Sequence, residues 1–188
     1  MTATCYGLGA DGIVAARSVG DGSAYVAWWV IEGHAPADDV FVMDGQSMMT
    51  TLHHEDELRV QPGAATVERG DIVVLHQGAV RGSSERLLVK RVIALPGETI
   101  EMRNCIVTID GQVLDEPYLD EHEVRPDDCG PEVAPTVILE SHVFVMGDNR
   151  DASQDSRSSD VGQIAYDDIV GVVGAVRAPG GDWQPIDG

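Results

Sequence analysis

The sequence predicts a mainly β protein built from short antiparallel strands. Short apolar runs recur along the chain, Gly, Asp and Pro turns separate them, and the periodicity of long amphipathic helices is nearly absent. Asp110-Gly111 lies between two such runs and is a strong hairpin signal, because both residues tolerate a positive φ. The expected strands are 40–43, 71–76, 87–95, 99–103, 106–109, 112–114, 143–146 and 169–176.

The length of 188 residues and the 43 % hydrophobic content indicate one ordinary domain with a real core. We expect an N-terminal lead-in without a transmembrane helix over 1–39, in which residues 24–31 form a buried strand or a short helix. The main β domain is expected over 40–177, with a hairpin and acidic insert at 104–140. Residues 178–188 are expected to form a C-terminal tail.

The net charge of −20 argues against nucleic-acid partners and against electrostatic attachment to anionic lipid. The apolar run at 24–31 is far shorter than the ~20 residues that a membrane-spanning helix needs. The N-terminus also lacks the basic segment of an export signal. The sequence as written therefore predicts a soluble, cytoplasmic protein with no membrane span, and it says nothing of the oligomeric state.

Metal and disulfide chemistry have little support in the sequence. The three cysteines, Cys5, Cys105 and Cys129, are odd in number and form no CxxC pair, so free thiols are expected. The run 120–123 (Asp-Glu-His-Glu) lacks the spacing of a calcium loop, and a solvated acidic loop is the favoured interpretation. We expect no metal and no cofactor.

Ser47 and Lys90 could act together as nucleophile and base. Ser47 follows the expected strand 40–43 at a tight turn, and Lys90 is the one lysine of the chain. A serine hydroxyl needs a base within hydrogen-bond reach, and a lysine is a base only when neutral. Apolar surroundings must therefore lower its pKa from about 10.4 by roughly 2–3 pH units. Strand alternation places Leu88 and Val92 on the same face as Lys90, which supplies such surroundings.

A dense polar stretch, 147–157 (GDNRDASQDSR), follows the expected strand 143–146. Taken alone it is typical of a solvated loop. Its Asp155 and Arg157 could pair, and Ser153 could form a hydrogen bond with an amine. Such a loop could orient a lysine that reaches it.

The order of these motifs resembles the bacterial type I signal peptidases, the serine/lysine-dyad peptidase family. The nucleophile box, Ser-Met-x-Pro-Thr-Leu, is Ser47-Met-Met-Thr-Thr-Leu in this chain. The Gly-Asp-Ile-Val-Val box, the Lys-Arg-Val-Ile-x-Leu-Pro-Gly-Asp/Glu box, the Gly-Asp-Asn-Arg box and an Asp/Asn-Glu-Pro-Tyr-Leu segment follow. They match residues 70–74, 90–98, 147–157 and 115–119.

The resemblance implies a signal-peptidase-like β-fold and an endopeptidase that cleaves peptides or preproteins after small residues, in an Ala-x-Ala-like context. Ser47 would attack the scissile carbonyl and Lys90 would take its proton. Gly45 and the Ser47 N–H would belong to the oxyanion hole, and Met48 would line a substrate pocket. Ser153 would bind the Lys90 amine, and Asp155 and Arg157 would brace the loop.

This chain departs from the pattern of the signal peptidase family in two respects. Thr50 occupies the position of the family's proline, which we expect to loosen the turn after Ser47. The family's N-terminal membrane helices have no counterpart in the sequence as written.

Three other interpretations remain open at this point. His53-His54 could serve a Ser-His-Asp hydrolase, although the G-x-S-x-G elbow is missing. A soluble relative could act on a natural product or a precursor peptide. A non-catalytic binding module could also use the same fold.

Overall fold

The computed structural model describes residues 39–64, 67–77, 87–119 and 129–186, together with the strands at 5–7, 13–18 and 24–29. Within this part of the chain the secondary structure is almost entirely β, apart from the 3-10 helix η1 (Tyr166–Asp168). The predicted fold class is confirmed. No helix in the described ranges has the length and hydropathy needed to cross a membrane.

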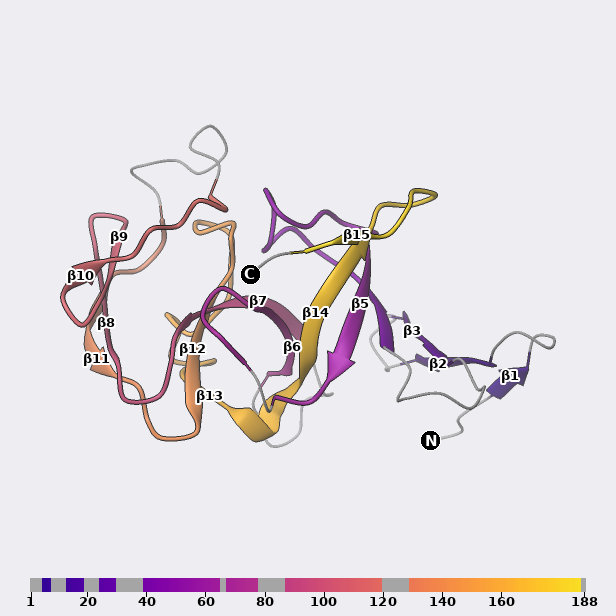
Figure 1. Ribbon diagram of the computed structural model, residues 1–188, viewed down its shortest axis with the longest axis horizontal. Helices are drawn as coiled ribbons and strands as arrows, with labels where there is room; N and C mark the ends of the chain where they lie inside the picture. Colours follow the sequence, from indigo (N-terminus) through magenta and orange to yellow (C-terminus); the bar gives the residue numbers. More distant parts are fainter. Residues whose placement is uncertain are drawn as a thin grey trace.

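The strands form three antiparallel sheets (Figure 1). The first has the order β1-β2-β3, with β1 (Cys5–Gly7), β2 (Ile13–Ser18) and β3 (Ala24–Trp29). The second has the order β10-β9-β8-β11, with β8 (Thr99–Arg103), β9 (Ile106–Ile109), β10 (Gln112–Val113) and β11 (Val133–Val137).

The third and largest sheet has eight strands in the order β13-β12-β7-β6-β14-β5-β4, and β15 adds to β14. Its strands are β4 (Asp39–Val42), β5 (Glu57–Pro62), β6 (Ile72–His76), β7 (Leu87–Ala94), β12 (His142–Met146), β13 (Ile164–Ala165), β14 (Ile169–Arg177) and β15 (Gln184–Pro185).

Every strand expected from the sequence is present, with ends shifted by at most one residue. The β9–β10 hairpin turns at Asp110 (φ 49°) and Gly111 (φ 78°), as their tolerance of positive φ predicts. Residues 24–29 form a strand rather than a helix. The strands that the sequence analysis did not anticipate are β1, β2, β5, β11, β13 and β15.

The expected domain boundaries at 39/40 and 177/178 stay predictions. Strand β15 lies beyond the second boundary but pairs with β14, where Ala175 faces Pro185. Much of the acidic insert, residues 120–128, lies outside the described residues.

The eight-stranded sheet is buried on both faces at its centre. Along β6, Ile72 and Val74 pack into one apolar cluster, and Val73 and Leu75 pack into another. Because side chains alternate along a strand, a continuous apolar run places residues in both clusters. This double burial explains why β6 reads as an unbroken hydrophobic run.

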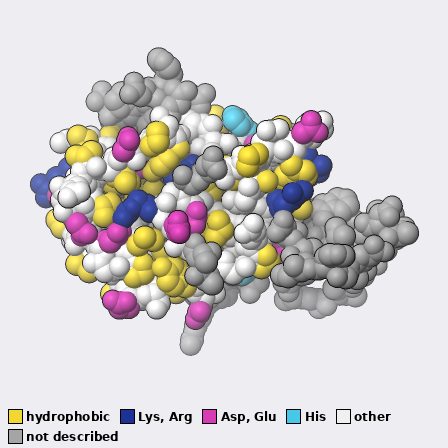
Figure 2. Space-filling model, in the orientation of Figure 1, with side chains coloured by type: hydrophobic (Ala, Val, Ile, Leu, Met, Phe, Trp, Pro, Cys, Tyr) yellow, Lys and Arg dark blue, Asp and Glu magenta, His cyan; other side chains and the backbone are white. Residues whose placement is uncertain are grey.

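The four-stranded sheet packs one face against the end of the large sheet. Ile100 and Met102 of β8 are fully buried in a cluster that also contains Ile93 and Phe144. Other large apolar residues of this sheet and of the segment after it remain exposed, and hydrophobic side chains are visible on this side of the surface (Figure 2). They are Ile106, Val113, Val137 and Leu139.

Candidate active site

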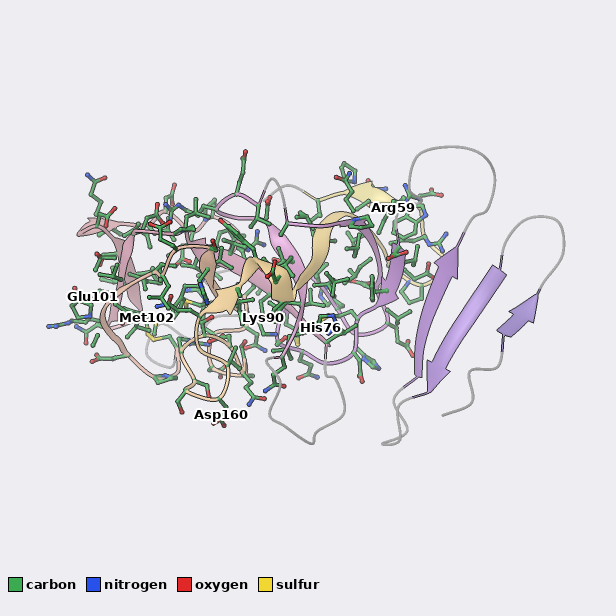
Figure 3. All side chains as sticks on the ribbon, turned by 90° about the horizontal axis from the view of Figure 1, so that it is seen from below. Arg59, His76, Lys90, Glu101, Met102 and Asp160 are labelled. Atoms are coloured by element: carbon green, nitrogen blue, oxygen red, sulfur yellow. A yellow bond between two sulfur atoms is a disulfide. The ribbon has the colours of Figure 1, made fainter. Side chains whose placement is uncertain are left out.

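Ser47 and Lys90 meet although they are far apart in the sequence. Ser47 lies in the turn that follows β4, and Lys90 lies within β7, where it pairs with Val73. The Lys90 Nζ atom lies 2.7 Å from Ser47 Oγ and 2.7 Å from the backbone oxygen of Val89. Lys90 is 2 % exposed and lies deep in the sheet (Figure 3). A buried amine therefore contacts the hydroxyl.

Strand alternation accounts for the burial of Lys90. Val92 and Leu88, two residues away on either side, both pack into the same apolar cluster as Val73. Apolar surroundings disfavour an ammonium ion relative to a neutral amine. The environment that the sequence predicted for Lys90 is present.

Backbone hydrogen bonds and buried side chains hold the turn that carries Ser47. The backbone oxygen of Met48 accepts from the N–H groups of Thr51 (3.0 Å) and Leu52 (2.8 Å). The Met48 and Leu52 side chains are fully buried in the cluster that contains Leu58 and Val60 of β5. This packing fixes the backbone that follows Ser47.

The segment after β12 also holds this turn, through hydrogen bonds from Asn149. Asn149 donates its backbone N–H to the oxygen of Ser47 (3.1 Å) and its side-chain amide to the oxygen of Gln46 (3.0 Å). Gly147 allows this approach, since a Cβ atom there would lie 2.3 Å from both Ser47 O and Ser153 Oγ. Ser153 Oγ is buried, and its hydroxyl contributes to lowering the pKa of Asp155.

Asp155 and Arg157 form a buried ion pair below this segment. Arg157 Nε lies 2.8 Å from Asp155 Oδ1, and the Gly147 N–H donates to Asp155 Oδ2 at 3.0 Å. Burial by itself would raise the pKa of Asp155. The hydrogen bonds and charge of Arg157, together with the Gly147 N–H, outweigh burial and hold that pKa below its ordinary value. The pair thereby fixes the Gly147 backbone.

A second buried ion pair, missed by the sequence analysis, lies beside Lys90. Arg91 and Asp148 are both almost fully buried, with Arg91 Nη2 lying 2.8 Å from Asp148 Oδ2. Thr51 donates its hydroxyl to the same carboxylate oxygen at 2.6 Å. The signal for this pair was present in the sequence, because a charge within an apolar strand needs a partner.

A third ion pair connects the site to residues 116–118, which lie within the expected insert 104–140. Arg150 donates to Glu116 (Nη1 to Oε2, 3.1 Å), and Glu116 also accepts from the Tyr118 hydroxyl at 2.6 Å. The Arg91 guanidinium lies 3.9 Å above the Tyr118 ring. Burial and the Glu116 charge raise the pKa of Tyr118, which keeps its hydroxyl a neutral donor.

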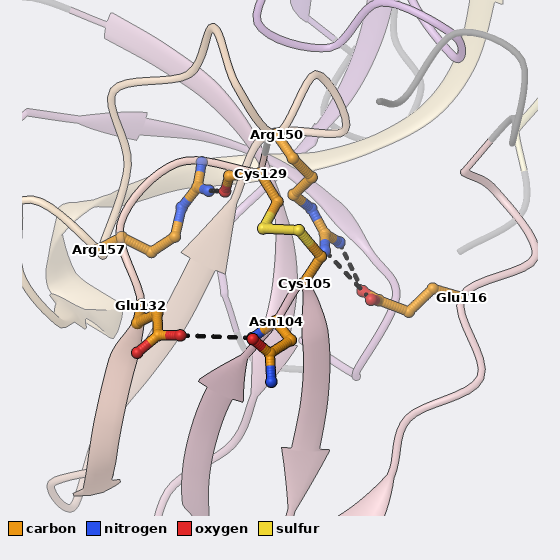
Figure 4. Close-up of a disulfide and its surroundings, with 7 residues drawn as sticks. All are labelled: Asn104, Cys105, Glu116, Cys129, Glu132, Arg150 and Arg157. Carbon is orange, nitrogen blue, oxygen red and sulfur yellow. Dashed lines mark hydrogen bonds and ion pairs between the residues drawn. A yellow bond between two sulfur atoms is a disulfide. The ribbon is translucent and has the colours of Figure 1, made fainter. Parts of the chain in front are cut away.

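The expectation of three free thiols is wrong. Cys105 and Cys129 form a disulfide (Figure 4). The antiparallel pairing of β11 with β8, in which Val133 faces Met102, brings the two cysteines together across 24 residues of sequence. The Cys129 carbonyl also accepts from Arg157 Nη1, so the disulfide adjoins the Asp155–Arg157 pair. An odd cysteine count and a long-range pairing hid this bond from the sequence analysis.

The roles expected for Gly45 and Met48 stay predictions, and the structure gives only their surroundings. The Gly45 N–H donates to Nδ1 of His54 at 3.4 Å, and Gly45 adopts φ 110°. Met48 has no exposed surface, so the structure makes it a core residue and does not bring it to the surface beside Ser47.

The residues of the other interpretations are His53, His54 and the acidic run 120–123. His53 and His54 are mostly exposed and face Asp56 and Asp44 of their own loop, at 3.8 and 3.5 Å. The acidic run 120–123 lies outside the described residues. In the ranges that are described, no three His, Cys, Asp or Glu residues are placed to hold a metal ion.

Comparison with known proteins identifies the family. The family described as "Signal peptidase, peptidase S26" matches residues 31–177, a range that contains Ser47, Lys90 and Gly147–Arg157. The chain belongs to this family. As an S26 signal peptidase family member it is a serine peptidase.

Relatives in the signal peptidase family align over most of this chain. Signal peptidase I S of Bacillus subtilis (strain 168) is 40 % identical over 126 residues, which cover 63 % of this chain and 65 % of the relative. Signal peptidase I U of the same strain is 35 % identical over 150 residues, covering 77 % and 78 %. A solved signal peptidase I from Enterococcus faecalis V583 has a TM-score of 0.49 and 28 % identity, covering 59 % of this chain and 99 % of that one.

Proposed function

We propose that the protein is an endopeptidase of the signal peptidase I type, with Ser47 as its nucleophile and Lys90 as its general base. The observation that carries the proposal is the 2.7 Å contact between Ser47 Oγ and a Lys90 amine that is 2 % exposed. The family match and the names of the relatives favour this function over a repurposed relative or a non-catalytic module.

The proposed reaction proceeds through an acyl-enzyme. Ser47 Oγ attacks the scissile carbonyl while its proton passes to the neutral Lys90 Nζ, and the Ser47 N–H stabilises the oxyanion. The protonated amine then gives its proton to the leaving amine nitrogen as the C–N bond breaks. Lys90, neutral again, takes a proton from water as the hydroxide attacks the ester, and returns it to Ser47 Oγ.

The supporting residues act on the position of these two groups. The buried Ser153 hydroxyl, close to Gly147 and Ser47, is the partner proposed for the Lys90 amine. Asp155 and Arg157 fix the Gly147 backbone. By resemblance to the family, the substrate is a preprotein or peptide with small residues before the cut.

The disulfide is relevant to the cellular compartment in which the domain acts. Disulfides form and persist in oxidising compartments and are rare where thiols are kept reduced. The Cys105–Cys129 bond therefore favours a location outside a reducing cytoplasm, contrary to the location that the sequence suggested.

Cleavage of an Ala-x-Ala peptide by matched variants tests the mechanism. We expect Ser47→Ala and Lys90→Ala to lose at least about 10³-fold in kcat, because each removes a reacting group. The exposed Ser159→Ala is the matched control and should cleave like the wild type. Cleavage that survives Lys90→Ala but not His53→Ala/His54→Ala would instead support a histidine mechanism.

The pH profile supplies a second test. Lys90 acts as a base only after losing its proton, so kcat should rise with pH to a plateau at about 8–9. A rise centred at about 6–7 would indicate histidine and contradict the lysine mechanism.

A further inference from the structure

The turn after Ser47 contains an unusual backbone conformation at Thr50. The Thr51 N–H donates to the Met48 oxygen at 3.0 Å, which closes a β-turn with Thr50 at its third position. Thr50 has φ 94°, a region that β-branched residues rarely adopt. Turns with a positive φ at this position usually carry Gly or Asn there.

Contacts on both sides hold Thr50 in this conformation. Its hydroxyl donates to the backbone oxygen of Tyr118, 68 residues further along, at 3.2 Å. The Tyr118 ring lies under the Arg91 guanidinium. The next residue, Thr51, donates to Asp148, and Leu52 is fully buried. A sparsely populated conformation persists only where the surroundings determine it to this extent.

The contact with Tyr118 connects the nucleophile turn to a different part of the chain. Ser47 is clamped by Asn149 before the turn, and Thr50 is tied to Tyr118 within it. The direction of Ser47 Oγ toward Lys90 therefore depends on a turn that is held at both ends. This differs from the loosened turn that the absence of proline led us to expect.

We infer that Thr50 is a positioning residue for Ser47 and that its left-handed backbone excludes proline from this turn. Proline fixes φ near −65° and cannot adopt φ 94°. A proline at position 50, which the signal peptidase motif carries, would therefore change the turn in this chain and move Ser47 away from Lys90. The inference rests on the proposed function of Ser47 and Lys90.

Peptide cleavage by a Thr50 series tests the inference. Thr50→Pro should lower kcat by about 10- to 100-fold with little change in KM, because a small displacement of a nucleophile has effects of that size. Thr50→Val keeps the shape but loses the bond to Tyr118, so its kcat should fall several-fold. Thr50→Ser keeps the hydroxyl and should restore kcat to near the wild-type value.

Thr136→Val is the matched control, since it also removes a threonine hydroxyl bonded to a backbone oxygen (that of Ala134) but far along the chain in β11. It should leave kcat unchanged. If Thr50→Pro does not fold, as judged by its thermal unfolding, the Val and Ser variants decide the question. Wild-type kcat in Thr50→Pro, or in Thr50→Val, overturns the inference. Cleavage that persists in Ser47→Ala overturns the proposed function instead.

Discussion

The two larger sheets of this protein are stabilised in different ways. The eight-stranded sheet is covered on both faces at β6 and β7, and its buried charges are held in hydrogen-bonded pairs. The four-stranded sheet leaves large apolar residues exposed and carries a covalent bond from the β8–β9 turn to the start of the β11 segment. Packing dominates in the first sheet, and a cross-link supplements limited packing in the second.

The difference explains why the proposed Ser47–Lys90 dyad lies in the larger sheet. Burial disfavours an ammonium ion relative to a neutral amine, and β7 buries Lys90 to 2 % exposure. The four-stranded sheet has one buried face and could not supply such a site. The four-stranded sheet supports the site indirectly, because the carbonyl of Cys129, just before β11, accepts a hydrogen bond from Arg157.

The largest effect is expected from breaking the buried ion pair of the eight-stranded sheet. Asp148→Ala leaves Arg91 charged, buried and unpaired, and should lower the free energy of unfolding by about 3–5 kcal/mol. Urea denaturation measures this change, and the exposed Asp160→Ala is the matched control. A loss no larger than that of the control would show that packing alone stabilises this sheet.

A smaller effect is expected from removing the cross-link of the four-stranded sheet. Cys105→Ser/Cys129→Ser should lower the free energy of unfolding by about 2–4 kcal/mol, and reductant should lower that of the wild type similarly. Reductant should leave the double variant unchanged. Titration of the unfolded wild-type protein should find two more thiols after reduction than before it, and equal counts would contradict the bond.

The smallest effect concerns Asp155, which lies where the two regions meet. Its pKa is lowered in the folded protein, so its contribution to stability is present at neutral pH. That contribution disappears as the pH falls below the ordinary value of about 4 and through the lowered pKa. The difference in unfolding free energy between wild type and Asp155→Asn should therefore shrink between pH 7 and pH 3. A difference that is constant with pH would mean that the Asp155 charge has no part in bracing the site.

Several strands of the large sheet could be predicted because buried strands appear in the sequence as short apolar runs. The runs at β6 and β12 are apolar almost throughout, and β7 is apolar apart from Lys90 and Arg91. Glycine or proline follows each run. Strand β5 (ELRVQP) has buried Leu58 and Val60 but polar neighbours and a proline, so its pattern was too short to notice. Strand β11 contains Pro135 in an acidic stretch, and its pairing with β8 is decided by tertiary contacts.

The sequence pointed to the two central residues of the candidate site but not to the residues that hold them in place. The apolar neighbours of Lys90 and the turn at Ser47 were compatible with a dyad, and the ordered motifs that resemble the signal peptidases selected these two residues. The roles of Asp148 and Tyr118, the positive φ of Thr50 and the Cys105–Cys129 bond all depend on contacts between distant segments. No local pattern encodes such contacts, so only the folded chain reveals them.

The Cys105–Cys129 bond has a consequence for damage to the chain. A protease that cuts anywhere between these two residues would leave both fragments covalently joined. The nicked protein would migrate as one species in a non-reducing gel and separate in two only after reduction. The segment between the cysteines can therefore be severed without the two halves of the enzyme parting.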